Sequence, residues 1–312
     1  MNSSVFSLCL LPENARLQVI RSFDYVHLIA FSLISTKTKG LVKSLSLTIK
    51  TLTVYIDAYG RKTLNLNLFF DDKFNYGIIE FEIYQNIGEE RTPGMPLIGL
   101  DEVSEFVHYS SDLDGYSNND TFAWNTPGFS FKMWLDHFCS LFKPKYSRFH
   151  VRAQDEIVDT VAIRNLFHEW TGVGIERASC SYAEKILELF SPCARNFDTG
   201  SMEGFLTFPQ KFGIENFDII CSSYSLKLED LLILNAKDIT VKKFSVSDAN
   251  RFFKCWTKGS NPRMKRLFMF LMKEADNGIV RGGYDIRSKK GIVATIQICN
   301  RFSPIITMHV WD

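Results

Sequence analysis

The sequence has little net charge and no long apolar run. Its 312 residues include 36 basic and 35 acidic side chains, so the formal net charge is only +1. A chain of this kind has no overall field that would attract nucleic acid or an anionic lipid surface. The longest apolar stretches, residues 25–34 and 267–272, fall well short of the roughly 20 residues that a transmembrane helix needs. We therefore expect neither nucleic acid nor a membrane as a partner.

An export signal and a cysteine framework are also missing. The apolar run at residues 5–11 has no Lys or Arg before it and is followed at once by polar residues, unlike a secretory signal. Seven cysteines are scattered along the chain without a CxxC pair, as is usual for buried free thiols. The 46% of hydrophobic residues is ordinary for a folded protein. We expect a soluble intracellular chain of the cytoplasm or the nucleus.

Local catalytic and metal-binding motifs are missing as well. The six histidines form no HxxxH or HExxH pattern, and there is no GxxxxGK loop and no GxSxG elbow. His137 and Cys139 lie two residues apart on a predicted helix, so they point about 200° apart and cannot share a metal. Gly172 and Gly174 give only a partial GxG, which we interpret as a turn before a strand. We expect that the chain is not an enzyme and that it binds neither a metal ion nor a cofactor.

One basic cluster surrounds the Gly-Ser-Asn-Pro segment at residues 259–262. Its members are Lys254, Lys258, Arg263, Lys265 and Arg266. Contact with a phosphate or an acidic target is one interpretation. The simpler one, which we prefer, is a helix C-terminus where cations interact favourably with the helix dipole, followed by a solvated turn.

Residues 11–44 predict three short helices with too much apolar surface. Pro12 suits the first helical position, Asp24 suits the N-cap of a second helix at about 25–33, and a third begins near Ser35 or Thr36. The second helix is apolar almost all round, whereas a surface helix normally has a narrow apolar stripe. So short a segment cannot bury this surface by itself. Either the rest of the chain or a second chain must cover it.

From about residue 45 the apolar period changes from 3.6 to 2. Residues 52–56, 64–68 and 79–83 alternate apolar and polar side chains, which predicts a small antiparallel sheet with one buried face. Residues 86–128 are rich in Gly and Pro and predict a long loop with a domain boundary.

The remainder alternates between helix and strand. Predicted helices lie at about 133–142, 158–170, 183–190 and 246–258, the last with Ser245 and Asp248 as a capping box. Predicted strands lie at 149–151, near 175, and at 205–208, 219–221, 231–234, 239–241, 267–271, 292–298 and 306–310. Several strands recur roughly every 25–30 residues, a spacing that resembles leucine-rich repeats.

The predicted fold class is therefore α+β or α/β, with three parts. Residues 1–46 form a three-helix unit, residues 47–128 a small antiparallel sheet and a long loop, and residues 129–312 an alternating strand–helix domain that resembles irregular leucine-rich repeats.

Two regions together resemble a known family. The N-terminal segment resembles the F-box through Leu11-Pro12, Val19-Ile20, Phe23, Leu28-Ile29, Leu33 and Leu41-Val42. Residues 134–142, 231–241 and, most specifically, Asn-Arg-Phe-Phe-Lys-Cys-Trp-Thr-Lys-Gly-Ser-Asn-Pro-Arg at 250–263 resemble nematode F-box proteins with a type-two F-box-associated domain. The resemblance extends over about residues 11–285.

This resemblance implies a non-catalytic adaptor that acts by proximity. The three helices would dock on the Skp-family adaptor of a Skp–cullin–F-box ubiquitin ligase, and the C-terminal domain would hold an unidentified protein target near the ubiquitin-loading enzyme. The implied adaptor contacts are Leu11, Pro12, Ile20, Leu28, Ile29 and Leu33. The alternative is a protein-interaction module without a ligase role, in which the C-terminal domain covers the three helices within the chain.

Overall fold

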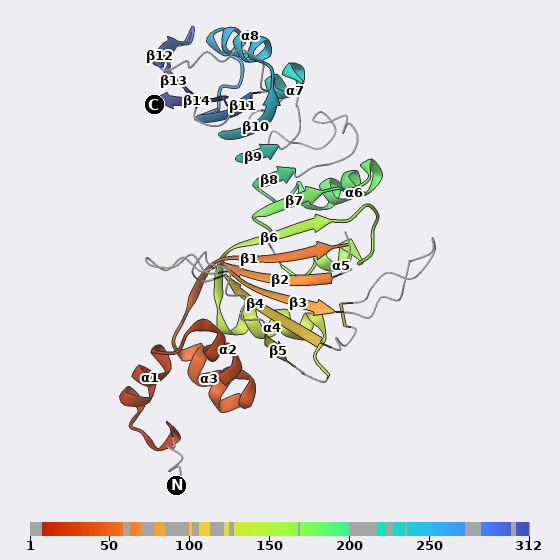
Figure 1. Ribbon diagram of the computed structural model, residues 1–312, viewed down its shortest axis with the longest axis vertical. Coiled ribbons are helices and arrows are strands. Elements are labelled where there is room, and N and C mark those ends of the chain that lie inside the picture. The colour runs from red at the N-terminus through yellow and green to blue at the C-terminus, as the bar shows by residue number, and fades with distance from the viewer. Residues whose placement is uncertain are drawn as a thin grey trace.

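The chain forms one long sheet with three helices at its N-terminal end. The structure, a computed structural model, describes residues 8–58, 63–69, 78–84, 100–101, 106–112, 122–124, 128–167, 169–199, 217–222, 227–234, 236–271, 282–300 and 304–311. The strands stack along the long axis of the molecule, with the N-terminal helices at one end and β12, β13 and β14 at the other (Figure 1).

The three predicted N-terminal helices are confirmed. A short 3₁₀ turn, Leu8–Leu10, precedes α1 (Glu13–Arg21), α2 (Tyr25–Ile34) and α3 (Thr36–Ser44). The Asp24 carboxylate accepts a hydrogen bond from the backbone N–H of His27 at 2.8 Å, which satisfies a free donor at the start of α2. Ser35 and Thr38 form a reciprocal capping box on α3. Local polar groups therefore set the helix boundaries.

The strands that follow belong to a large mixed sheet and not to a small antiparallel one. The strands β1 (Thr48–Asp57), β2 (Thr63–Phe69) and β3 (Ile78–Tyr84) form where expected, and they pair antiparallel. On its other edge, however, β1 pairs parallel with β6 (Lys143–Arg152), so the antiparallel strands continue the main sheet. No sequence pattern predicts this pairing, because it joins segments that lie far apart in the chain.

The predicted loop at residues 86–128 contains two further strands. The strand β4 (Phe106–Asp112) pairs with β3, and β5 (Phe122–Trp124) pairs with β4. Most other residues of that loop lie outside the described part of the chain, as does the strand expected at 205–208. Hydrogen bonds to the neighbouring strand hold β4 and β5 in the sheet, although β4 contains several polar residues and β5 is only three residues long.

The second half adds parallel strands one after another. These are β7 (Gly172–Glu176), β8 (Asn196–Thr199), β9 (Ile219–Ser222), β10 (Asp238–Phe244) and β11 (Arg266–Leu271), each parallel to the strand before it. Three antiparallel strands complete that edge in the order β14 (Pro304–Trp311), β13 (Val293–Asn300) and β12 (Gly282–Arg287). The likeness to leucine-rich repeats stays a prediction.

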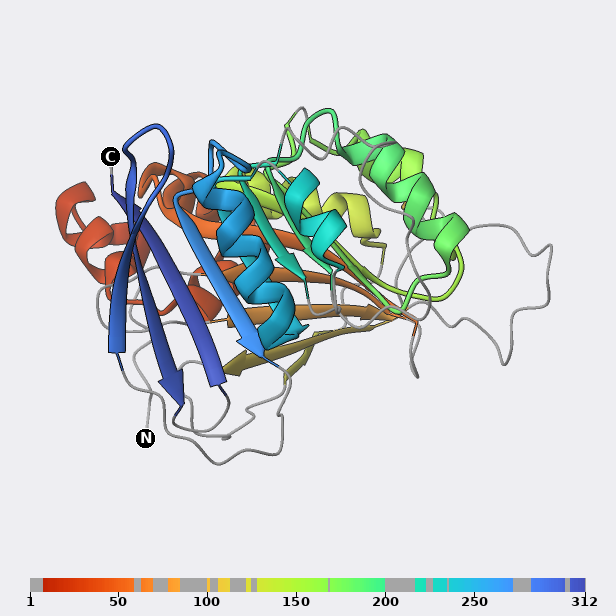
Figure 2. The ribbon, with the colours of Figure 1, turned by 90° about the horizontal axis from the view of Figure 1, so that it is seen from above.

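Helices cover one side of these strands. They are α4 (Phe131–Leu141), α5 (Thr160–Arg164), α6 (Cys180–Phe190), α7 (Leu228–Ile233) and α8 (Val246–Thr257). Figure 2 gives the view along the stack, in which α6 and α7 lie on the same side of the parallel strands. Large aromatic side chains fill the space between helices and strands: Phe149 stacks on Phe190 at 4.7 Å, and Trp170 meets Phe190 edge to face at 5.3 Å.

Two expectations about local structure are wrong. Residues 231–233 belong to the helix α7 and Leu234 is its C-cap, because Leu228 and Leu231 bury one helical face. A short apolar run cannot by itself distinguish strand from helix. The helix expected at 158–170 is limited to α5. Trp170 instead leads into β7, and its indole N–H donates to the carbonyl oxygen of Arg164 at 2.9 Å.

Asn261 joins the end of α7 to the loop that follows α8. It is 3% exposed and has a φ of 50°, a left-handed conformation that Asn tolerates better than most residues. Its side-chain amide donates to the carbonyl oxygens of Leu231, at 2.9 Å, and Leu234. These carbonyls lie at the C-terminal end of α7, where a helix leaves its acceptors unsatisfied. One side chain therefore fixes two elements.

We predict that Asn261→Ala lowers the free energy of unfolding by about 2–4 kcal/mol, because two buried carbonyls lose their donor and a residue with a Cβ must hold a positive φ. Asn261→Gly removes the same hydrogen bonds without the backbone strain and should cost about 1 kcal/mol less. Urea unfolding of both variants measures the difference. Two variants as stable as the parent would contradict this role of Asn261.

Candidate functional site

The three N-terminal helices bury some of the predicted adaptor contacts and expose others. Ile20, Leu28 and Ile29 are buried inside this chain, at 0–3% exposure. Leu11 and Leu33 are half-buried, and Pro12 is exposed. The predicted contact of these six residues with a partner stays a prediction.

Two further apolar side chains lie open at this end of the molecule. Leu10 is 85% exposed and Ile34 is 72% exposed, the highest values for large apolar side chains in the described part of the chain. The helical pattern did not single them out, because Leu10 precedes α1 and Ile34 is the last residue of α2. Exposed apolar side chains on a surface where apolar residues gather are typical of an interface.

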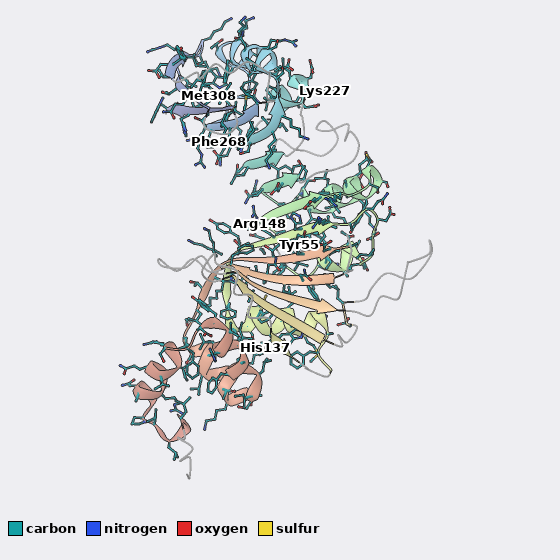
Figure 3. All side chains as sticks on the ribbon, in the orientation of Figure 1. Tyr55, His137, Arg148, Lys227, Phe268 and Met308 are labelled. Atoms are coloured by element: carbon teal, nitrogen blue, oxygen red, sulfur yellow. The ribbon has the colours of Figure 1, made fainter. Side chains whose placement is uncertain are left out.

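The helices α2 and α3 are fixed to the rest of the molecule through α4. Ser32 of α2 is 2% exposed and His137 of α4 is 6% exposed, and the Ser32 Oγ lies 2.8 Å from the His137 Nε2 (Figure 3). The Ser32 hydroxyl donates its only hydrogen to the carbonyl oxygen of Ile29 at 2.6 Å. His137 therefore donates from Nε2, so Nε2 is the ring nitrogen that carries a hydrogen in the neutral form.

The environment of His137 opposes protonation. Burial, and secondarily the positive charge of Lys39, lower its pKa to about 4. The imidazole is therefore neutral at neutral pH. Protonation would place a positive charge in a buried site near Lys39, which is unfavourable.

The opposite side of the sheet carries polar side chains. On β1 and β6, residues 51, 53, 55 and 57 lie in register with residues 146, 148, 150 and 152, and their side chains point away from the aromatic core. We call this surface the helix-free face. Figure 3 labels Tyr55 and Arg148, two of its members. Tyr55 stacks on His150 with ring centroids 4.7 Å apart and an angle of 17° between the planes.

Two glycines make room for the side chains of this face. Gly172 and Gly174 lie in the strand β7 and not in a turn as we expected, and they pair with Arg148 and His150. A Cβ at Gly174 would lie 2.2 Å from the His150 Nδ1. The space above the glycine is therefore occupied by the imidazole. A glycine in a strand is typical of such a close approach.

A shallow hollow of about 190 Å³ lies at this point of the face. It is lined by Thr53, Tyr55, Asn67, Phe69, Arg148, Phe149, His150, Val173, Gly174 and Asp198. Burial, with a smaller contribution from Arg148, lowers the pKa of His150 to about 4 although Asp198 opposes the shift. Burial and the charges of Asp57 and Glu176 raise the pKa of Tyr55 to about 12. Both rings are neutral at neutral pH and can exchange hydrogen bonds with a ligand.

A guanidinium group and two carboxylates lie next to this hollow, outside its lining. The Arg152 guanidinium lies 3.4 Å from Asp57 and 3.6 Å from Glu176, and Glu176 lies 3.8 Å from the His150 Nε2. These mixed charges favour recognition of a polar protein surface rather than of a uniformly charged polymer. The sequence contains one sign of this face. Every second residue of β6 is polar or aromatic (Tyr146, Arg148, His150 and Arg152), and such alternation indicates that one face of a strand is open to solvent.

The described residues contain no group of three or more His, Cys, Asp or Glu side chains that could hold a metal ion. Among the helices that the structure describes, none combines the length and the apolar character needed to cross a bilayer.

Comparison with known families identifies two regions of the chain. Residues 8–50 match the F-box domain, and these residues include the three helices α1, α2 and α3. Residues 208–269 match a family described as F-box associated, which includes α7, β10 and α8. Neither the comparison with curated proteins nor that with solved structures gives a match. This pair of domains is typical of substrate adaptors in Skp–cullin–F-box ubiquitin ligases.

We predict that acidification weakens the fold partly through His137. The folded-state pKa of about 4 lies below the ordinary 6.5, so the unfolded chain binds more protons between these values and stability falls as the pH falls through this window. From pH ~7.5 to pH ~5 this group should lower the free energy of unfolding by about 2 kcal/mol. His137→Gln keeps a side-chain N–H donor and should remove this share of the pH dependence.

Urea unfolding of the parent and of His137→Gln at both pH values measures this share. His27→Gln is the matched control, because it makes the same change at a histidine whose side chain is 73% exposed. An unchanged pH dependence in His137→Gln would contradict the assignment.

We also predict that Gly174→Ala lowers the free energy of unfolding by about 1–3 kcal/mol, since the new methyl group overlaps the His150 ring. Gly172→Ala is the control from the same strand. Its Cβ would meet the Arg148 Nε at 3.1 Å, and that flexible side chain can move away. Thermal unfolding should rank Gly174→Ala clearly below Gly172→Ala. Equal losses of stability would mean that the His150 ring moves away from the new methyl group as easily as the Arg148 side chain does.

Proposed function

We propose that this chain is the substrate-recognition subunit of a Skp–cullin–F-box ubiquitin ligase. The observation that carries the proposal is that the region matching the F-box folds as three helices with Leu10 and Ile34 left open at one end of the molecule. These helices would bind the Skp-family adaptor and through it a cullin. The strand–helix part of the chain would bind a protein target.

In this proposal the predicted adaptor contacts fall into two groups. Leu11, Pro12 and Leu33 are at least partly accessible and would touch the adaptor together with Leu10 and Ile34. Ile20, Leu28 and Ile29 already pack inside the chain and would instead hold the three helices in their arrangement. Burial of apolar side chains is the main favourable contribution to most protein association.

The target would lie on the helix-free face. The sheet presents there a continuous row of polar and aromatic side chains from β1 to β8 that no helix of the described chain covers. The ligase would act by holding the target near the ubiquitin-loading enzyme, so the chain itself would need no catalytic group. The proposal includes an intracellular location and membership of the nematode family that the segment at 250–263 resembles.

A second candidate function is a protein-interaction module without a ligase role. The observation that favours it is the packing of α2 and α3 on α4, sealed by the buried contact of Ser32 with His137. The rest of the chain thus covers part of the apolar surface. Leu10 and Ile34 remain uncovered, which favours the adaptor proposal.

We predict that Ile34→Lys and Leu10→Lys each weaken binding of a purified Skp-family adaptor by about tenfold, because each places a charge in an apolar contact. The matched control is Ile233→Lys, which makes the same change at the last residue of another helix, α7, where the side chain is 44% exposed. Gel filtration and titration calorimetry of the full chain measure complex formation. No complex between the parent chain and the adaptor at about micromolar concentration would refute the ligase role.

A further inference from the structure

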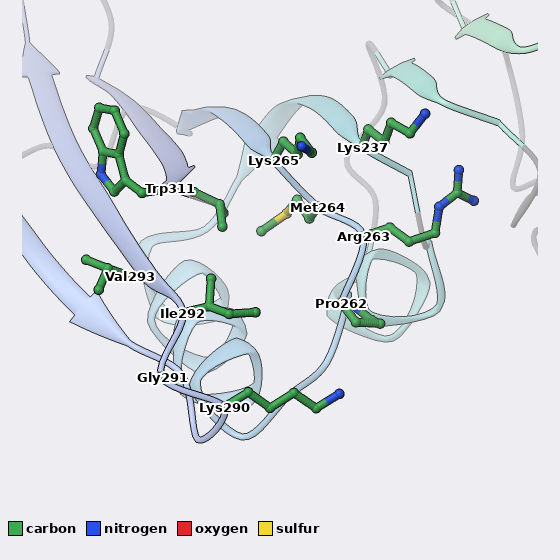
Figure 4. Close-up of a pocket in the computed structure, with 11 residues that line it drawn as sticks. Lys237, Pro262, Arg263, Met264, Lys265, Lys290, Gly291, Ile292, Val293 and Trp311 are labelled. Atoms are coloured by element: carbon green, nitrogen blue, oxygen red, sulfur yellow. The ribbon is translucent and has the colours of Figure 1, made fainter.

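A basic hollow lies near the C-terminal edge of the sheet. Its volume is about 570 Å³, within the range of roughly 300–1,000 Å³ that is usual for ligand sites. Figure 4 shows its lining, which comes from the starts of β10 and β11, the turn between β12 and β13, and the end of β14. The lining residues are Lys237, Pro262, Arg263, Met264, Lys265, Lys290, Gly291, Ile292, Val293, Val310 and Trp311.

The charged residues of this lining all have the same sign. Lys237, Arg263, Lys265 and Lys290 are basic, and none of the described residues that line the hollow is acidic. Asp218 lies 3.1 Å from the Lys237 ammonium and 2.8 Å from the Arg263 guanidinium, so one carboxylate serves two cations. The described lining of the hollow is therefore basic, although the chain as a whole is nearly neutral.

The other part of the lining is apolar. Met264 is buried and forms part of the floor, whereas Ile292 is 36% exposed and extends toward Met264 across the hollow (Figure 4). Lys290 lies along one rim in the same view. A site with an apolar floor and a basic rim fits a ligand that has an apolar group beside a negative charge.

The walls of the hollow are held in place before any ligand binds. Asn261, whose amide binds the end of α7, fixes the loop that carries Pro262 and Arg263. The turn that carries Lys290 is attached to α8, because the Lys289 backbone N–H donates to the carbonyl oxygen of Thr257 at 2.8 Å. Preorganised walls lower the entropy cost of binding.

We propose that this hollow binds an acidic peptide segment of the target, in which an apolar side chain sits on Met264 and Ile292 while flanking carboxylates face the basic rim. The proposal rests on the proposed function, since it gives the target of the ligase a second contact in addition to the helix-free face. It also gives a role to Arg263 and Lys265, two members of the basic cluster that sequence reasoning assigned to a solvated turn.

A peptide fits these observations better than a lipid surface or a nucleic acid. The cations surround a concave apolar floor and do not form a flat or extended basic face. Asp218 pairs with both Lys237 and Arg263 and so neutralises part of their positive charge. The site therefore suits a ligand whose negative charge is spread over several carboxylates. Lys290 has no ion-pair partner among the described residues, so its charge is available to a ligand.

Fluorescence polarisation with the full chain tests the proposal. The probe is a short labelled peptide of glutamates around one leucine, and the comparison peptides replace glutamate by lysine or leucine by serine. The first probe should bind, and both replacements should weaken binding by about tenfold or more. Rising salt should weaken the complex, because exposed charges are screened.

Two pairs of variants localise the binding. Lys290→Glu should weaken peptide binding by about five- to tenfold, whereas Lys289→Glu, the same charge reversal on an equally exposed neighbour outside the hollow, should change it less than twofold. Ile292→Ser should weaken binding as the serine peptide does, while Ile233→Ser on α7 should not. Equal effects of Lys290→Glu and Lys289→Glu, or equal binding of the glutamate and lysine peptides, would overturn the proposal.

Adaptor binding by the same proteins separates this proposal from the proposed function. Lys290→Glu should bind the Skp-family adaptor like the parent. Adaptor binding without peptide binding would refute the hollow alone, and peptide binding without adaptor binding would refute the ligase role alone. Stronger binding to phosphatidylserine vesicles or to single-stranded RNA than to the acidic peptide would also overturn the proposal.

Discussion

The parallel pairing of β1 with β6 is the constraint on which the rest of the structure depends. It runs from Thr48 paired with Lys143 to Asp57 paired with Arg152 and joins two segments about 95 residues apart in the chain. Without it, the antiparallel strands and the parallel strands would be two separate sheets with unpaired edges. Because β1 directly follows α3, the same pairing also sets where the N-terminal helices stand.

This constraint explains why one sheet has two faces of opposite character. A parallel sheet usually has helices on both faces. Here the described helices between the parallel strands pack against the side that carries Phe149 and its aromatic neighbours. The other side carries polar and aromatic side chains, with glycines between them. Gly172 and Gly174 follow from this arrangement, since the side chains of Arg148 and His150 lie over them.

The sequence predicts what depends on neighbours along the chain and misses what depends on distant partners. The caps at Asp24, Ser35 and Ser245 are local hydrogen bonds, and the helices that they begin were predicted closely. The interpretation of Gly172 and Gly174 as a turn was wrong, because their role depends on a neighbouring strand. Leu10 and Ile34 could not be recognised as exposed, since exposure is decided by what α3 and α4 cover.

Strand pairing connects the two ends of the molecule. The buried contact between Ser32 and His137 fixes the N-terminal helices to α4, and consecutive strand pairing continues from β6 to β14. The basic hollow lies at the starts of β10 and β11, strands that stand at the end of the sheet away from the N-terminal helices (Figure 1). A ligase subunit that works by proximity needs a fixed separation between adaptor and target. A continuous hydrogen-bonded sheet supplies this separation better than a flexible linker, because its length changes only if strand pairs break.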